Sequence, residues 1–276
     1  MTTFEAMGTS VWVHGGGADR VAAWFEQVED VCSRFRPDSE LSHLNARSPG
    51  WSSISPLLHT VLAAAEQARM MTRGLVDPAI GAAVEAWGYD RSFELVTDTE
   101  VAPGPVPSGS WTLGDGSVWT GAGTRLDLGG VAKGWACDRA VDSGLATVVN
   151  AGGDLRSDHP DLRVEVLHPD GTIVATVQVG QGALATSSTT RRRWQAGNRT
   201  ASHLIDPRTG EPVESPVQSA TALTATAVEA EAAAKAMLLS GVDSLAWAEG
   251  QSWVRAGLVV WWDGTVFATP GLELAA

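Results

Sequence analysis

The stretch LRVEVLHPDGTIVATVQVG, residues 162–180, contains two apolar runs separated by a turn sequence. Both runs are rich in β-branched side chains and alternate with polar residues, a pattern that is typical of strands. Pro-Asp-Gly lies between the runs at 169–171 and favours a tight reversal of the chain. The stretch therefore predicts a β-hairpin with two antiparallel strands.

The rest of the chain extends this pattern. A second hairpin is predicted from 256–262 and 265–270, which flank an Asp-Gly turn. Other strands are predicted at 8–14, 111–114, 117–120, 146–150 and 218–225. Apolar residues that recur three and four apart predict helices at 18–36, 55–74, 79–87, 130–144 and 227–241. Because helices and hairpins are interspersed, we expect an α+β fold with mixed or antiparallel sheets and flanking helices.

Composition limits the possible partners. The chain has 276 residues and a formal charge of −13, from 19 Lys and Arg against 32 Asp and Glu. A negative charge of this size disfavours binding to nucleic acids and to anionic membranes, although local donors can still hold an anionic ligand. We find no internal repeat and no long linker, so one domain spanning 1–276 is predicted.

The location of the protein is predicted from what the sequence does not contain. Cys32 and Cys137 are the only cysteines, too few for a disulfide framework. We find no run of about 18 apolar residues and no signal peptide at the start of the sequence. We therefore expect a cytoplasmic protein that does not insert into membranes.

The stretch LDLGGVAKGWACD, residues 126–138, places two glycines and a lysine at the expected start of a helix. Asp127 is expected to end a strand, and Gly130 to let the backbone approach a ligand. The backbone N–H groups of a helix start favour an anion, which Lys133 could also reach. A tight turn with a surface lysine explains the same residues, and neither a Walker A nor a GxGxxG motif is present.

Three further motifs leave alternatives open. Asp77 precedes a proline, where it serves as an N-cap or as a ligand contact. The loop after Asn150, which contains Asp154, is either an ordinary turn or the base of a binding site. His203 is either a structural histidine or a donor to phosphate groups.

The last motif is VEAEAAAKAMLLSG, residues 228–241, with Glu231 and Lys235 four residues apart on a predicted helix. Such a pair on a helix surface contributes about 0.2–0.5 kcal/mol and needs no functional explanation. The alternative is that the helix presents both groups to a ligand.

Eight stretches, taken in chain order, resemble the FAD:protein FMN transferases, or ApbE-type flavin transferases. They are MGTSVWV (7–13), SRFRPDSELSHLN (33–45), VDPAIGAAVEAWG (76–88), LDLGGVAKGWACDRA (126–140), VVNAGGDLR (148–156), ALATSS (183–188), HLIDPRTGEPV (203–213) and ATAVEAEAAAKAMLLSG (225–241). Each stretch is weak evidence by itself, whereas eight in the right order are specific.

The resemblance implies a single α+β domain that binds FAD and cleaves its pyrophosphate. The FMN half passes to a threonine of a target flavoprotein, and AMP leaves. It also implies a divalent metal ion, usually Mg²⁺, beside the pyrophosphate. A metal or another cation is needed there because negative charge must be held while a phosphoryl bond breaks.

The resemblance also assigns roles to the first half of the site. Met7 would lie against the flavin or its ribityl chain. Asn45 matches a position that helps to decide between transfer and plain FAD hydrolysis. Asp77 would contact the adenosine, and Asp127 would bind FAD.

In the second half of the site, the resemblance places Lys133 near the pyrophosphate. It makes Gly130 a metal ligand through its backbone carbonyl. His203 and Ile205 would border the adenine and the phosphates. Asn45, Lys133 and His203 are thus the candidate catalytic residues.

Two positions depart from the family pattern. Glu231 and Lys235 stand where most members have an aspartate and a threonine that ligate the metal. Glu231 keeps a carboxylate, but a protonated ammonium has no lone pair for Mg²⁺ and repels it at close range. We hypothesise that Lys235 replaces the metal and meets the FAD pyrophosphate, held in position by Glu231.

Three functions are compatible with these features. The first is an FAD-binding flavin transferase. The alternative is a non-catalytic protein that binds or stores FAD, with Lys235 in place of the metal. The third is a metal-dependent FAD pyrophosphatase, against which Asn45 counts because it replaces a bulky aromatic residue.

Overall fold

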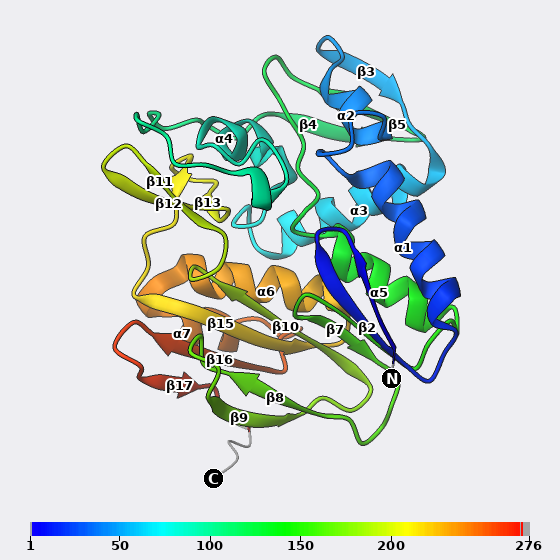
Figure 1. The fold of residues 1–276 in the computed structure, drawn as a ribbon, viewed down its shortest axis with the longest axis vertical. Helices are drawn as coiled ribbons and strands as arrows, with labels where there is room; N and C mark the ends of the chain where they lie inside the picture. Colours follow the sequence, from blue (N-terminus) through cyan, green and yellow to red (C-terminus); the bar gives the residue numbers. More distant parts are fainter. Residues whose placement is uncertain (1, 271, 273–276) are drawn as a thin grey trace. The chain divides into compact units, whose positions relative to one another are not determined.

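The computed structural model describes residues 2–270 and 272 and confirms the predicted α+β fold (Figure 1). The hairpin predicted at 162–180 is present as strands β8 (Arg163–Leu167) and β9 (Ile173–Gln178). The two strands are antiparallel, with Leu167 opposite Ile173. The strands are joined by a short loop that contains the Pro-Asp-Gly sequence. A short loop allows only antiparallel pairing, and its length sets the register.

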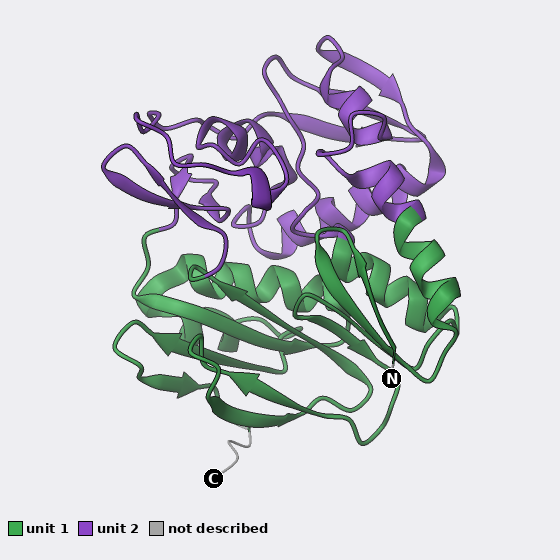
Figure 2. Cartoon of the chain, viewed as in Figure 1, with its two compact units in different colours: residues 1–26, 133–190, 214–276 green, residues 27–132, 191–213 purple. Residues whose placement is uncertain are grey.

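The chain divides into two compact units, each built from several segments (Figure 2). Unit 1 comprises Met1–Glu26, Lys133–Thr190 and Glu214–Ala276, and unit 2 comprises Gln27–Ala132 and Arg191–Val213. A single FAD-binding domain spanning 1–276 stays a prediction, and the two units are described separately below.

Unit 1 is built on an eight-stranded antiparallel sheet. The strand order is β1-β2-β6-β7-β10-β15-β16-β17. The bounds are β1 Thr2–Ala6, β2 Thr9–His14, β6 Val148–Ala151, β7 Asp154–Ser157, β10 Gly182–Ser188, β15 Val217–Thr224, β16 Ala256–Trp261 and β17 Val266–Ala268. The predicted strands at 8–14, 146–150, 218–225 and the C-terminal hairpin are confirmed within two residues at most ends.

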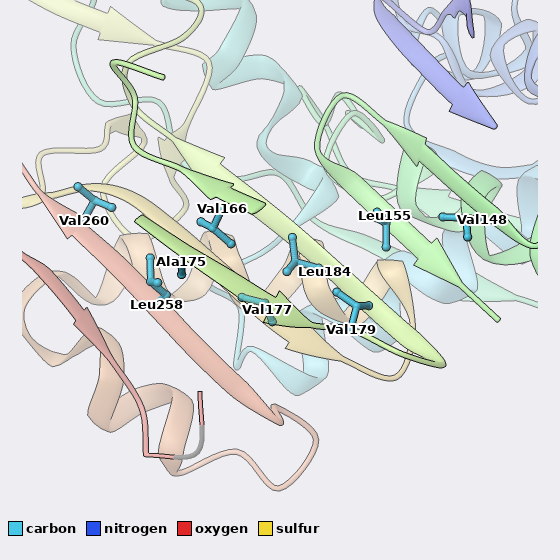
Figure 3. Close-up of a cluster of buried hydrophobic side chains, with 9 residues drawn as sticks. All are labelled: Val148, Leu155, Val166, Ala175, Val177, Val179, Leu184, Leu258 and Val260. Atoms are coloured by element: carbon cyan, nitrogen blue, oxygen red, sulfur yellow. The ribbon is translucent and has the colours of Figure 1, made fainter. Parts of the chain in front are cut away.

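The β8–β9 hairpin packs against this sheet through a cluster of buried aliphatic side chains (Figure 3). Val166 and Val177 come from the hairpin, whereas Leu184 and Leu258 come from the sheet. Burying such side chains is worth about 1.5–3 kcal/mol each, so the hairpin is part of the core of unit 1.

Helix α6 (Ala227–Ser240) packs against strands β10 and β15. Ala183 and Ala185 flank Leu184 on β10, and Ala222 lies opposite Ala185 on β15. Because side chains alternate along a strand, these alanines face away from the hairpin cluster. Alanines on the helix and on the strands let the two backbones come close, which explains why most of the buried positions of α6 hold alanine.

Helix α5 (Ala132–Asp142) holds the N-terminus of α6. The buried Asp138 carboxylate accepts hydrogen bonds from the backbone N–H groups of Ala227 at 2.7 Å and Val228 at 3.1 Å. Thr226 and Glu229 complete a capping box at the same helix end. Together these contacts satisfy donors that the first turn of a helix otherwise leaves unpaired.

A glycine lets the two helices approach each other. A Cβ atom placed on Gly134 would lie 2.9 Å from the carbonyl oxygen of Ala227, which is too close for a side chain. With glycine at this position, the backbone of α5 can lie directly against the backbone at the start of α6.

The remaining helices of unit 1 are shorter or shared. Helix α1 (Ala18–Cys32) begins in unit 1 and ends in unit 2. The segment after α6 forms the 3-10 turn η3 (Gly241–Asp243) and helix α7 (Ser244–Glu249).

Unit 2 combines short helices with small antiparallel sheets. The three-stranded sheet has the order β3-β5-β4, and β11–β12 and β13–β14 form two hairpins. The strands are β3 Gly50–Ser53, β4 Trp111–Gly114, β5 Ser117–Thr120, β11 Arg193–Ala196, β12 Arg199–Ser202, β13 Ile205–Asp206 and β14 Glu211–Pro212. The helices are α2 Glu40–Asn45, α3 Pro56–Met71, α4 Gly81–Ala86 and the 3-10 turns η1 Pro78–Ile80 and η2 Phe93–Leu95.

Two buried tryptophans connect the parts of unit 2. The Trp87 indole donates to the carbonyl oxygen of Gly210 at 3.0 Å, and the Trp194 indole donates to the carbonyl oxygen of Trp87 at 2.7 Å. Both rings lie in one apolar cluster with Tyr89 and Ile205. Each indole thus buries a large apolar area while its N–H keeps a partner.

Three boundary predictions need correction. The helix predicted at 18–36 ends at Cys32, because the carbonyl of Ser33 is taken by the hydroxyl groups of Ser39 and Ser42. The helix predicted from 130 begins at Ala132. Asp127 does not end a strand, since its backbone N–H donates to the carbonyl oxygen of Pro78 at 2.8 Å in an irregular segment.

No helix in the described part of the chain has the length and apolar character needed to cross a membrane. Cys32 and Cys137 are both buried free thiols.

The Asp138 contact gives the first testable prediction. Burial raises the pKa of Asp138 to about 7, against hydrogen bonds from Ala227 and Val228 that lower it. In the unfolded chain this carboxyl has the ordinary aspartate pKa of 3.8, so the folded chain keeps a proton that the unfolded chain has already released. We expect the Asp138 contribution to the free energy of unfolding to fall as pH rises from about 4 to 7.

Urea unfolding of the wild type and of Asp138→Asn across this pH range tests the prediction, because asparagine has no titrating proton. One proton changes the free energy of unfolding by at most about 1.4 kcal/mol per pH unit. The variant should lack the part of the pH dependence that Asp138 causes. Asp161→Asn, at an exposed aspartate away from this contact, serves as the control and should keep the wild-type slope. Equal slopes for wild type and Asp138→Asn would contradict the prediction.

Candidate functional site

Four charged side chains of unit 1 meet in a buried cluster, which we call the lysine–carboxylate cluster: Lys133, Asp154, Glu231 and Lys235. Lys133 Nζ lies 3.2 Å from Glu231 Oε1 and 3.2 Å from Asp154 Oδ2. Lys235 Nζ lies 2.8 Å from the same Glu231 Oε1. The Glu231 side chain is only 3% exposed. Glu231 and Lys235 are therefore not a surface pair.

Local structure explains why these groups converge. Gly152 and Gly153 both have positive φ angles, of 64° and 106°, and form the tight turn between β6 and β7. This turn places Asp154 at the start of β7, beside the first turn of α5, which carries Lys133. On α6, residues four apart share a face, so Glu231 and Lys235 point the same way.

The charges in the cluster shift each other's pKa values. Burial and the nearby Glu231 charge raise the pKa of Asp154 to about 6, although the two lysines lower it. Burial also opposes ionisation of Glu231, but Lys133 and Lys235 outweigh it and lower its pKa. Burial lowers the pKa of Lys133, yet Glu231 and Asp154 raise it overall. At neutral pH these shifts keep Lys133 protonated and leave Glu231 and Asp154 as carboxylates.

This donor set does not fit a divalent metal ion. Both ammonium groups contact Glu231 Oε1 at 2.8–3.2 Å, so a cation on this carboxylate would lie close to two positive charges. Glu231 Oε2 has no hydrogen-bond partner within the described residues, but one open oxygen does not supply the several oxygen ligands of Mg²⁺. Residues 2–270 and 272 contain no group of three His, Cys, Asp or Glu side chains that could hold a metal.

Unit 2 holds Asp127 in a second charged arrangement. Arg34 Nε donates to Asp127 Oδ2 at 2.7 Å, and the backbone N–H of Gly129 donates to Asp127 Oδ1 at 2.7 Å. The Arg34 side chain is 5% exposed, and its guanidinium lies 4.1 Å from the ring centroid of Phe35 and 4.7 Å from that of Tyr89. Asp127 thus has a fixed orientation.

Asn45 is part of the same arrangement. Its amide nitrogen donates to the carbonyl oxygen of Leu126 at 2.9 Å, and its amide oxygen accepts from the N–H of Leu126 at 2.8 Å. In this structure Asn45 therefore positions the backbone next to Asp127. A role in choosing between transfer and hydrolysis stays a prediction.

Asp77 lies next to Pro78, the residue whose carbonyl accepts from Asp127. Asp77 Oδ1 accepts from the backbone N–H of Ala79 at 2.9 Å, which confirms the N-cap interpretation. The Trp111 indole donates to the same oxygen at 3.3 Å, and Arg69 Nε lies 3.1 Å from Asp77 Oδ2. Unit 2 thus connects Asn45, Asp77 and Asp127 through a short series of hydrogen bonds.

The other predicted site residues are more dispersed. Met7 and Gly8 both have positive φ angles, of 51° and 67°, and form the two-residue turn between β1 and β2 in unit 1. In unit 2, His203 follows β12, and its backbone N–H donates to the carbonyl oxygen of Arg192 at 3.3 Å. Ile205 is buried in the Trp87 cluster, and Gly130 lies in the turn before α5.

Two residues of these arrangements were not among the predicted site residues. Asp154 was noted only as part of a loop, although a charged residue directly after Gly-Gly at a strand start indicates a special position. Arg34 lies in the stretch SRFRPDSE, where nothing in the local pattern distinguishes it from the nearby Arg36. Its role depends on Asp127, 93 residues away in the chain.

Comparison with known proteins shows which family the chain belongs to. The model of the ApbE family matches residues 7–257. The chain belongs to the ApbE family. The match includes residues of both units and every residue of the lysine–carboxylate cluster.

Curated relatives of this family are similar to the chain in sequence. An FAD:protein FMN transferase of Rhodobacter capsulatus is 31% identical over 300 residues, which cover 98% of this chain and 57% of the relative. An FAD:protein FMN transferase of Vibrio cholerae is 28% identical over 78% of this chain and 71% of its own length. The chain thus spans little more than half of the Rhodobacter protein.

Solved structures of ApbE proteins share the fold. The flavin transferase ApbE from Vibrio cholerae has a TM-score of 0.80 at 25% identity, covering 98% of this chain and 96% of that chain. The ApbE protein of Thermotoga maritima has a TM-score of 0.84 at 24% identity, with the same coverage.

The buried cluster gives the second prediction. Lys133→Met removes the ammonium that Glu231 and Asp154 share, which leaves buried carboxylate charge uncompensated. We expect the free energy of unfolding to fall by about 3–5 kcal/mol in urea at pH 7. Arg139→Met removes one exposed charge from the same helix and should cost less than about 0.5 kcal/mol. Similar losses in both variants would show that Lys133 does not stabilise the cluster.

Proposed function

We propose that the chain is an FAD:protein FMN transferase. In this reaction a threonine hydroxyl oxygen of a target flavoprotein attacks the phosphorus atom on the FMN side of the FAD diphosphate. The bond between that phosphorus and the bridging oxygen breaks, and AMP leaves with the bridging oxygen. The hydroxyl proton passes to a base, and the threonine ends as an FMN phosphodiester.

The observation that carries the proposal is the family match over residues 7–257. The names of the relatives from Rhodobacter capsulatus and Vibrio cholerae support it, because both are FAD:protein FMN transferases. The two buried ammonium groups add a chemical argument from the chain itself. Cations fixed in a site of low polarity can stabilise the charge that develops on a reacting diphosphate.

The residue roles are part of the proposal. Lys133 is proposed to hold the diphosphate, with His203 as a further donor to the phosphates. Asp127, fixed by Arg34, is proposed to bind FAD, and Asp77 to contact its adenosine. Asn45 is proposed to act beside Asp127, whose preceding residue it holds.

Met7 and Ile205 are proposed to border the flavin and the adenine. Gly130 and Glu231 are the positions at which the family holds its metal. Since two ammonium groups contact Glu231, no step of this mechanism is assigned to a metal ion. The proposed partners are FAD and a target flavoprotein in the cytoplasm, and nucleic acids are not expected to bind.

The third prediction tests the reaction itself. The purified chain is incubated with FAD and a target flavoprotein domain, in separate samples with Mg²⁺ and with EDTA. We expect covalent flavin fluorescence on the target in a denaturing gel, together with release of AMP. A target whose acceptor threonine is changed to alanine is the control and should remain dark.

Two other results would each replace the proposal. Intact FAD that stays bound, with no labelled target under either condition, would indicate the non-catalytic FAD-binding protein. FMN and AMP released in the absence of a target, and no labelled target in its presence, would indicate the pyrophosphatase. The relatives' names favour the transferase over both.

A further inference from the structure

Both lysines of the chain lie in one buried cluster. The sequence contains 17 arginines but only two lysines, Lys133 and Lys235. These two residues are 102 positions apart, since 235 − 133 = 102, and their ammonium groups contact the same oxygen, Glu231 Oε1. Where this chain needs a cation elsewhere it uses arginine, so a small ammonium group is a specific feature of this site.

The Lys235 ammonium has unused donors. A protonated lysine has three N–H donors. Within residues 2–270 and 272, its one hydrogen-bond acceptor is Glu231 Oε1 at 2.8 Å. The side chain is 18% exposed, so it is mostly removed from water but still reachable. Two N–H groups are therefore available to an acceptor from outside the cluster.

Lys133 makes this possible, because it gives Glu231 a second ammonium partner. Lys133 contacts both Glu231 and Asp154, so Glu231 keeps a cation beside it when Lys235 also contacts a ligand. The Lys235 charge can therefore act on a ligand without leaving a buried carboxylate unpaired. Without Lys133, Glu231 would have Lys235 as its one cation, and moving Lys235 towards a ligand would leave a buried carboxylate unpaired.

The ligand that fits these donors is an anion. Two ammonium and two carboxylate groups balance each other, so adding a divalent cation would create an excess of two positive charges in a buried place. An anion on Lys235 instead gains charge-assisted hydrogen bonds, which are stronger than those between neutral groups.

From this arrangement we propose that Lys235, supported by Lys133 through Glu231, binds a phosphate group of a nucleotide diphosphate directly, without a divalent metal ion. That the diphosphate is the one in FAD rests on the proposed function. The binding itself does not, and it can be measured without any transfer reaction.

The small number of lysines allows a direct observation of the site. Protein grown with ¹⁵N-lysine has two side-chain nitrogen signals, which Lys235→Met assigns. In the presence of EDTA, we expect ADP and FAD to shift the Lys235 Nζ signal as they saturate. No shift at a concentration where flavin fluorescence shows bound FAD, or no binding of either nucleotide without Mg²⁺, would overturn the proposal.

Affinity measurements with substituted chains give the second readout. In EDTA, Lys235→Met should weaken FAD binding about 10-fold to 100-fold, the effect of losing hydrogen bonds to a charged group. Arg139→Met removes an exposed charge from α5 and should change the Kd less than about twofold. Equal effects in both variants would mean that only net charge matters, and the proposal would fail.

A double variant tests the exclusion of the metal. Glu231→Asp with Lys235→Thr removes one ammonium and keeps a carboxylate, so two carboxylates then face one ammonium and the net negative charge favours a metal ion. We expect FAD binding by this variant to strengthen on addition of Mg²⁺, whereas wild type is indifferent. A wild-type Kd that itself falls with Mg²⁺, or a double variant that does not respond, counts against the proposal.

These outcomes separate the inference from the proposed function. A Lys235 shift with ADP and FAD but no labelled target supports the binding site and refutes the transferase. Labelled target with no Lys235 shift, or with full dependence on Mg²⁺, supports the transferase and refutes the binding site. Circular dichroism checks that each variant is folded. The nucleotide-dependent shift of the Lys235 Nζ signal is measured on the wild-type protein, so that result does not depend on the folding of any variant.

Discussion

The contact between α5 and α6 is the constraint on which the cluster in unit 1 depends. The Asp138 carboxylate accepts the first N–H groups of α6, and Gly134 lets the helices approach closely. With that register set, Lys133 meets Glu231. A shift of one residue along α6 would turn Glu231 by about 100° away from Lys133, because a helix turns once in 3.6 residues. The cluster is thus a consequence of how one helix end is capped.

Burial gives this arrangement its chemical character. An exposed pair of Glu231 and Lys235 would contribute little, since water and salt screen exposed charges. Inside unit 1 the same two residues share their environment with a second ammonium and a second carboxylate, and the pKa values of Lys133, Asp154 and Glu231 shift in response to the neighbouring charges. Unit 2 fixes its own charged residue, Asp127, through Arg34 and a backbone N–H. In both units, neighbouring protein groups stabilise the charged side chains in place of water.

Much of the fold could be predicted from local patterns. The β8–β9 and C-terminal hairpins, the Ser55 cap of α3 and the Gly241 end of α6 lie where turn and capping residues indicate. Strand β10 and hairpin β11–β12 were not predicted, because GALATSS lacks the large β-branched residues that mark a strand. Helix α1 ends early because the hydroxyl groups of Ser39 and Ser42 donate to the carbonyl oxygen of Ser33, the residue directly after the helix.

The sequence by itself determined the α+β class, the family resemblance and the spacing that places Glu231 and Lys235 on one helical face. It could do so because these features depend on neighbours within a few residues or on the order of motifs. Only the tertiary structure decided that Lys133 and Asp154 join that pair and that Arg34 binds Asp127. Arg34 and Asp127 are 93 positions apart in the chain, and Lys133 and Glu231 are 98 positions apart. Their distance and burial are set by packing between elements, which no local pattern encodes.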